Sequence, residues 1–269
     1  MPRFASPAFN LNDASWYETL VKNGVGNDLQ LCLDASDARS YDGSSQVWND
    51  LSAVPYNWNR GADASATSTD PTFNGSAGGF SSGEYWSFDG GDYFTPVTGV
   101  TNAFFQSVHK PGALFTLAAW VRLGAVGPTN QYIAGNTASG SVRGFFWGFA
   151  SANGRLRFIA ANGSVAFVDA TATSLSVPAA GQWYFFATAV DAAASSGRHY
   201  MNGAEHSFSP NYGAASATDG PNTLSVGAAM ATLPLTNTSR MASFAAWSTA
   251  LTKAELDMIF DRTRGKFGV

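Results

Sequence analysis

The sequence is poor in charge and in cysteine. Only 13% of its 269 residues are charged, the net charge is −4, and no run of Lys or Arg occurs. Because nucleic-acid binding needs a cationic surface that releases counterions, a nucleic acid is excluded as the expected partner. The single Cys32 excludes an internal disulfide, and its position in a strand-like run predicts an inert buried thiol.

Long apolar runs are missing as well. No stretch of roughly 18 apolar residues could span a membrane, and the first residues, MPRFASPAFNLND, contain no apolar segment of the kind found in secretion signals. We therefore expect no membrane insertion. We also expect synthesis and folding in a cytoplasm, which need not be where the protein works.

Aromatic residues and glycine are abundant, with 20 Phe, 9 Tyr, 8 Trp and 28 Gly. This composition favours strands and tight turns over helices. In the run 114–123, LFTLAAWVRL, alternation places Phe115, Leu117 and Val121 on one face of an expected strand. The strand-like runs also contain four tryptophans that are expected in the core: Trp120, Trp147, Trp183 and Trp247.

Three Asn-Gly pairs, at 153–154, 162–163 and 202–203, lie between strand-like runs. Asn-Gly supplies the positive φ that a type I′ turn requires, so the first two pairs predict a three-stranded meander and the third a two-residue hairpin. In that hairpin His199 would pair with His206 on one face of the sheet. The two imidazoles are candidate ligands of a transition metal, but the local sequence offers no third ligand. The alternative is a polar pair on the solvent face.

Residues 1–27 are expected to form an N-terminal arm followed by a short helix capped by Asp13. Phe4, Phe9 and Leu11 would be costly to expose on a free tail, so the arm should dock on the protein's own sandwich or on a neighbouring subunit. Together with Trp16 of the short helix, they are the candidate docking residues.

A second helix is expected near the end of the chain. Thr252 and Glu255 have the spacing of a capping box, Leu256 and Ile259 belong to its apolar stripe, and Gly265 marks its expected end.

Five segments, in this order, resemble laminin-G-like, concanavalin A-like jelly rolls: LCLDASDARSYDGSSQVWNDLS, YWSFDGGDYF, FTLAAWVRL, GQWYFFATAVDAAASSGRHYMNG and FAAWSTALTKAELDMIFDRTRGKFG. The resemblance covers residues 28–269 and implies an all-β sandwich of two antiparallel sheets. Versions that open in this way are frequent among bacteriophage virion proteins and bacterial surface proteins. The resemblance therefore implies a non-catalytic virion structural protein, most plausibly a capsid decoration protein that docks through its arm.

That interpretation places the protein on the virion surface, with the shell or other phage structural proteins as partners and with oligomers left open. The alternatives are a carbohydrate-binding lectin and a tail-associated adhesion module that binds surface glycans. A glycan hydrolase or lyase is a further alternative.

Catalytic carboxylates are not where related hydrolases would carry them. Enzymes of this fold commonly place two carboxyl groups on one strand as E-x-D-x-E. None of the four Glu residues begins such a pattern: Glu18, Glu84, Glu205 and Glu255. The protein is therefore expected not to be an enzyme.

The segment SFDGGDYF sets Asp89 and Asp92 around two glycines. Two carboxylates in a loop are candidate calcium ligands. A tight corner between strands needs the same residues, with glycine for positive φ and Asp bonding the local backbone. The corner is the favoured interpretation. No cofactor is expected, and calcium is the open alternative.

Sugar binding requires exposed aromatic faces with amide groups nearby. PYNWNRG offers Tyr56 and Trp58 interleaved with Asn57, Asn59 and Arg60. These five are the candidate sugar-binding residues. The alternative is that both rings pack beneath the loop.

Overall fold

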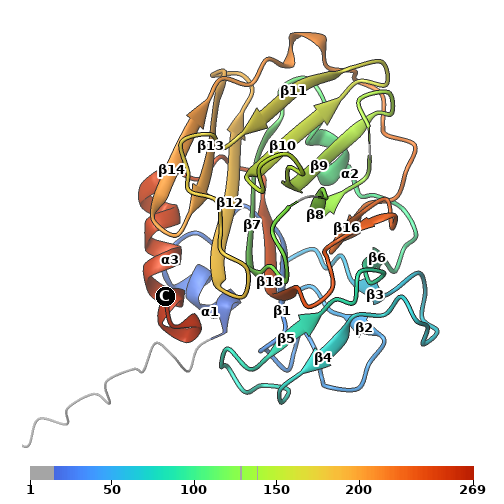
Figure 1. The fold of residues 1–269 in the computed structure, drawn as a ribbon, viewed down its shortest axis with the longest axis vertical. Coiled ribbons are helices and arrows are strands. Elements are labelled where there is room, and N and C mark those ends of the chain that lie inside the picture. Colours follow the sequence, from blue (N-terminus) through green and yellow to red (C-terminus); the bar gives the residue numbers. More distant parts are fainter. Residues whose placement is uncertain (1–14, 128, 138) are drawn as a thin grey trace, which may run out of the picture.

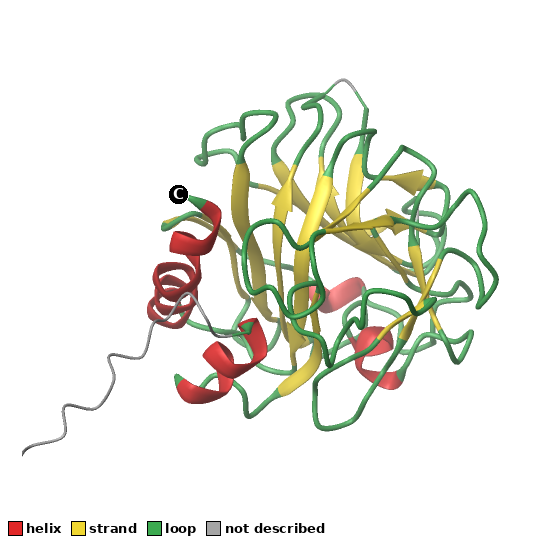
Figure 2. Ribbon diagram, turned by 90° about the horizontal axis from the view of Figure 1, so that it is seen from below, coloured by secondary structure: helices red, strands yellow, loops and turns green. Residues whose placement is uncertain are grey.

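The computed structural model describes residues 15–127, 129–137 and 139–269. Within them, the strands form two sheets that pack face to face, while helices α1 and α3 lie against the outside of one sheet (Figure 1). Figure 2 shows these helices beside the strands, so that the molecule has a helix layer and two sheet layers. The predicted all-β sandwich with helices near both ends is confirmed.

The sheet next to these helices, called sheet A, has the strand order β14-β13-β12-β7-β18-β5-β4, and β1 also pairs with β18. All of its pairs are antiparallel. Its strands are β1 (Leu29–Asp34), β4 (Thr72–Asn74), β5 (Tyr85–Ser87), β7 (Leu114–Arg122), β12 (Trp183–Asp191), β13 (Ser196–Met201), β14 (Ala204–Phe208) and β18 (Arg240–Trp247).

The opposite sheet, sheet B, has the order β11-β10-β9-β8-β15-β6-β3-β2, with β16 and β17 attached beside β8. Its strands are β2 (Val47–Trp48), β3 (Trp58–Arg60), β6 (Phe94–Pro96), β8 (Gln131–Gly135), β9 (Gly144–Phe149), β10 (Leu156–Ala161), β11 (Ala166–Thr171), β15 (Ser225–Val226), β16 (Ala228–Ala229) and β17 (Leu233–Pro234).

Strand β7 shows that part of sheet A is buried on both faces. Its alternate residues Phe115, Leu117 and Val121 belong to the core between the two sheets, as predicted. The intervening Ala118 and Trp120 belong to a second core beneath the helices. A strand that is apolar on both faces requires a cover on each side.

Helix α3 (Lys253–Phe267) supplies most of the outer cover. Its stripe of Leu256, Ile259 and Phe260 is buried in the second core, and the predicted capping box of Thr252 and Glu255 is present. The helix ends at Phe267, two residues beyond the Gly265 that the sequence suggested. Gly268, at φ 69°, ends it in the left-handed conformation that glycine allows.

Helix α1 (Trp16–Lys22) is capped by Ser15, whose side chain accepts a hydrogen bond from the Glu18 N–H, so the expected Asp13 cap is wrong. The short helix α2 (Ala103–Ser107) and the 3-10 turn η2 (Tyr212–Ala214) contribute Phe105 and Tyr212 to the core between the sheets.

The predicted meander is confirmed as β9-β10-β11, and the predicted hairpin as β13-β14. The turn types differ from the prediction. Only Asn202-Gly203 has both residues at positive φ, at 45° and 89°, as a type I′ turn requires. Asn153 and Asn162 instead accept backbone hydrogen bonds through their side chains, which turns the chain without positive φ at Asn.

Candidate functional site

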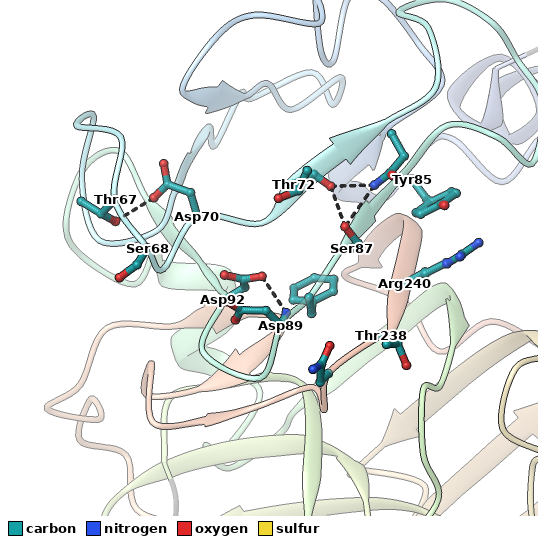
Figure 3. A pocket seen from close by; sticks show the side chains of 13 residues that line it. Thr67, Ser68, Asp70, Thr72, Tyr85, Ser87, Asp89, Asp92, Thr238 and Arg240 are labelled. Carbon is teal, nitrogen blue, oxygen red and sulfur yellow. Dashed lines mark hydrogen bonds between the residues drawn. The ribbon is translucent and has the colours of Figure 1, made fainter.

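A solvent-facing hollow of about 550 Å³ lies at the end of sheet A where β4 and β5 meet the loops 67–70, 88–92 and 237–238. Figure 3 shows Asp70, Asp89 and Asp92 at one end of this hollow, with Tyr85 and Arg240 at the other. Hydroxyl and amide side chains from β4, β5 and the loops line the space between them. We call this surface the rim hollow.

The acidic end is built by the corner at residues 88–92. The Asp89 N–H donates to an oxygen of Asp92 at 2.8 Å, and the Gly91 N–H donates to Asp89 at 2.8 Å. Gly90 has φ 97°, which only glycine adopts readily. Both carboxylates therefore hold the corner together, as the favoured interpretation states. No cluster of three or more metal-ligating side chains occurs among the described residues.

Asp92 is nonetheless unusual for a turn residue. Its side chain is only 3% exposed. Burial, reinforced by the neighbouring Asp89 carboxyl, raises the pKa of Asp92 to about 7. Asp70 faces the same hollow and accepts hydrogen bonds from Thr67 at 2.9 Å and Gln46 at 2.8 Å. The acidic end thus combines a buried carboxyl that titrates near neutral pH with carboxylates that accept hydrogen bonds.

The opposite wall is formed by the segment before β18. Thr238 adopts φ 67°, which is unfavourable for a β-branched residue, and its N–H donates to the Phe88 carbonyl at 2.9 Å. Backbone strain of this kind is retained where the surrounding structure imposes it, often beside binding sites. At the far end, the Arg240 guanidinium lies 4.4 Å from the centre of the Tyr85 ring.

Sequence reasoning found Asp89 and Asp92 but missed Asp70, Tyr85 and Arg240. These residues stand on separate segments, and only the pairing of β4 with β5 and of β5 with β18 brings the segments together. No local motif signals such a site.

The candidate sugar segment 56–60 is differently placed. Tyr56 is 6% exposed and Trp58 is fully buried, and both rings belong to the core between the sheets. The Asn57 side chain accepts a hydrogen bond from the Asp50 N–H, Asn59 is buried in β3, and Arg60 lies over the Trp86 ring. The assignment of these residues as sugar-binding candidates is therefore corrected in favour of the packing alternative.

The predicted register of His199 opposite His206 is confirmed, with the rings stacked at 6.3 Å. The expected solvent face is wrong for His199, which is fully buried and bonds Thr188 and the Ala170 carbonyl. Burial lowers the pKa of His199 to about 3. His206 bonds Ser174. Through these hydrogen bonds, the two histidines connect the edge of sheet A to β11 of sheet B and the residues that follow it.

The four glutamates occupy structural positions. Glu18 forms ion pairs with Lys22 and Arg39, and Glu205 pairs with Arg198. Glu84 is buried and accepts hydrogen bonds from Ser81, while Glu255 caps α3. Cys32 is fully buried, and burial raises the pKa of its thiol.

Of the docking candidates, Phe4, Phe9 and Leu11 lie outside the described residues. Trp16 is 4% exposed and packs edge-on against Phe185 and Trp247, so it attaches α1 to sheet A and offers no free docking face. None of the helices within the described residues is long and apolar enough to cross a membrane.

A comparison of the sequence with protein families agrees with the observed fold. Residues 88–257 match the model described as the concanavalin A-like lectin/glucanases superfamily, and the chain belongs to this family. No curated protein matches the sequence.

Solved structures with the same fold come from several kinds of protein. A Trypanosoma rangeli sialidase in complex with sialic acid aligns with a TM-score of 0.52 and 15% identity, over 87% of this chain and 32% of the sialidase chain. A structure of botulinum neurotoxin type C aligns with a TM-score of 0.59 and 11% identity, over 88% of this chain and 52% of the toxin chain. The cell entry of that toxin depends on interaction with two ganglioside molecules.

Domain 4 of an extracellular arabinanase from Geobacillus stearothermophilus, in complex with arabinotriose, gives a TM-score of 0.54 and 12% identity, over 88% of this chain and 98% of that domain. At these identities the likeness establishes the fold. This chain spans about a third of the sialidase.

Proposed function

We propose that the protein is a non-catalytic glycan-binding module and that the rim hollow is its binding site. The observation that carries this proposal is the composition of the hollow. One described surface gathers carboxylates, two amides, hydroxyls and the Tyr85 ring around a space of about 550 Å³. Sugars present hydroxyl groups and apolar C–H faces together, so a site for them needs both hydrogen-bonding groups and a ring.

The two ends of the hollow would serve different parts of a sugar chain. Asp70 and Asp89 can accept hydrogen bonds from sugar hydroxyls, and the Tyr85 ring can stack against a sugar face. Family membership supports the proposal. The three similar structures also support it, because their descriptions name sialic acid, gangliosides and arabinotriose as the ligands of those proteins.

A glycan array probed with the wild-type protein tests the proposal, with EGTA in a parallel set to test calcium dependence. Tyr85→Ala should abolish specific binding. Tyr17→Ala is the matched control, because Tyr17 is also half-buried beneath an arginine, Arg39, but stands on α1 away from the hollow. Absence of specific binding by the wild type, or equal loss in both variants, would contradict the proposal.

The non-catalytic part of the proposal is supported by the engagement of Asp89 and Asp92 in their own corner. A depolymerisation assay on the polysaccharides that score in the array tests it. If the wild type cleaves one of them and Asp89→Asn/Asp92→Asn does not, the protein is a hydrolase or lyase and the site is catalytic.

The virion interpretation is the second proposal. It is supported by the resemblance of the segment LDASDARSYDGSSQVWNDLS to virion versions of this fold. The protein would stand on the surface of a phage particle, as a head decoration or a tail-associated adhesion module, and residues 1–12 would dock it to the shell. Deletion of residues 1–12 should leave a folded sandwich that no longer binds particles. Unchanged particle binding would refute the role of the arm.

A further inference from the structure

A row of five side chains crosses sheet A beside the rim hollow. Strand pairing places Thr72 opposite Ser87, Ser87 opposite Arg240, Arg240 opposite Arg122, and Arg122 opposite Trp183. Cross-strand partners point to the same face of a sheet, so five strands contribute one line of hydroxyl, guanidinium and indole groups. We call this line the cationic row.

The cationic row faces away from the core. In the next register position, Phe73, Trp86, Met241 and Val121 pack in or against the core between the sheets. Because successive residues of a strand alternate between faces, the cationic row lies on the outer face. All five of its residues are partly or fully exposed, including Trp183, which was expected in the core.

Among the described residues, the two guanidiniums of the row have no anionic partner. No carboxylate of the described residues lies within ion-pairing distance of Arg122 or Arg240, whereas Arg39, Arg157 and Arg198 all form such pairs. Like charges in direct cross-strand opposition destabilise a sheet. An anion held between the two side chains would remove that repulsion.

The orientation of both side chains is already set. The Arg122 Nε donates to the Gly181 carbonyl at 2.6 Å, and Arg240 is stacked on the Tyr85 ring. Their remaining N–H groups are donors in the planar arrangement that suits a carboxylate or sulfate group. Tyr85 in turn contacts the Trp183 ring edge-on at 6.0 Å, so the arginines are flanked by two aromatic rings.

We infer that the cationic row binds the acidic group of an acidic glycan, a saccharide that carries carboxylate or sulfate groups. This inference rests on the proposed glycan-binding function and specifies its ligand. The chain would enter the hollow with its acidic group over Arg122 and Arg240 and its hydroxyl groups towards Asp70 and Asp89, because the carboxylates repel the acidic end.

Isothermal titration with three oligosaccharides of equal length tests the inference: oligogalacturonate, its fully methyl-esterified form, and a sulfated neutral oligosaccharide. The wild type should bind one or both acidic probes at least about tenfold more tightly than the ester, since a charge-assisted bidentate pair contributes about 1.4 kcal/mol or more. Added salt should weaken this preference.

Arg240→Gln and Arg122→Gln should each reduce the preference for the acidic probe about tenfold, measured within each variant as the ratio of its affinities for the acidic probe and for the ester. Arg262→Gln is the matched control, because it removes the same charge from an exposed position on α3. Arg240→Lys keeps the charge and should recover part of the affinity if the fold of Arg240→Gln is impaired. Thermal unfolding of each variant monitors folding.

Equal binding of the ester and the acidic probes by the wild type would overturn the inference and leave the proposed glycan-binding function intact. Loss of affinity in Arg262→Gln equal to that in Arg240→Gln would also overturn it, because the effect would then come from net charge. No binding of any probe, together with an empty glycan array, would overturn both.

Discussion

The outer face of sheet A is divided into two halves that the same strands build. In one half, Trp120, Phe185 and Trp247 lie beneath α1 and α3 and are at most 1% exposed. In the other half, the cationic row runs across strands of the same sheet with polar and charged residues, and at its end the partly exposed Trp183 ring lies 5.0 Å from Phe267 of α3. On β7, the two halves meet between Trp120 and Arg122.

This difference distinguishes residues that stabilise the fold from residues that are exposed to solvent. The covered half consists of large aromatic rings, and exposing them to water would lower the stability of the folded protein. The open half carries two opposed cations, which contribute little to folding. A residue set that is unfavourable for stability and accessible to solvent is a reasonable place for binding, and the two halves should respond differently to mutation.

The largest expected effect is on the covered half. Trp120→Ala should lower the free energy of unfolding by about 3–5 kcal/mol, because the ring is stacked 4.1 Å from Phe267 and its Nε1 donates to Thr263. Trp183→Ala, the same change at the end of the cationic row, should cost less, because this ring is partly exposed although it contacts Phe267 and Tyr85. Urea unfolding of both variants measures the difference, and equal costs would show that the halves are not energetically distinct.

The next effect concerns Asp92 in the rim hollow. Its folded pKa of about 7 lies above the ordinary 3.8, so the folded state holds a proton that the unfolded state releases between these values. Stability contributed by this carboxyl is complete below pH 3.8 and is lost as the pH rises towards 7. Asp92→Asn removes this loss.

Relative to the wild type, Asp92→Asn should therefore gain stability on the order of 2 kcal/mol between pH 4 and pH 8, since each pKa unit corresponds to about 1.4 kcal/mol and the carboxyl borders solvent. His199 acts in the opposite direction. Its pKa of about 3 means that stability falls as the pH drops from 6.5. That contribution is common to both proteins and cancels in the difference. Parallel pH dependences of unfolding in the two proteins would contradict the assignment.

A smaller effect is expected at the start of α3. Thr252→Ala removes the side chain that accepts from the Glu255 N–H and should cost about 1 kcal/mol, because the helix loses its N-cap. Thr72→Ala at the exposed end of the cationic row is the matched control and should change stability by less than about 0.5 kcal/mol. Thermal unfolding compares them. A cap loss no larger than the control would mean that docking alone holds the helix.

The smallest effect is expected for Arg240→Gln. Its stability should differ from the wild type by no more than about 0.5 kcal/mol, with a slight gain at low salt, where repulsion from Arg122 is relieved. The gain should vanish as salt screens the pair. Unfolding at two salt concentrations measures this. A large loss of stability would assign Arg240 to the fold and weaken the comparison between the halves.

Most of the sheet structure could be predicted from local patterns. Alternation in LFTLAAWVRL identified both faces of β7, and Asn202-Gly203 set the register that pairs His199 with His206. Such signals are short-range, because strand periodicity and turn chemistry involve residues close in the chain. The capping box of α3 was predictable for the same reason.

The candidate site could be predicted only in part. Asp89 and Asp92 stand three residues apart, and their corner was predicted from the local sequence. Tyr56 and Trp58 suggested a sugar platform because nothing local indicates that their loop turns both rings inward against Phe105. Whether an aromatic ring faces solvent depends on which distant segment covers it, and this is information that composition does not contain.

The sequence alone determined that the chain forms strands and where several of its turns lie. The tertiary structure decided that Thr72, Ser87, Arg240, Arg122 and Trp183, drawn from five separate strands, form one row beside the rim hollow. The physical reason is that a strand's own residues set which face each side chain takes, whereas its neighbours are set by sheet order, a property of the whole fold.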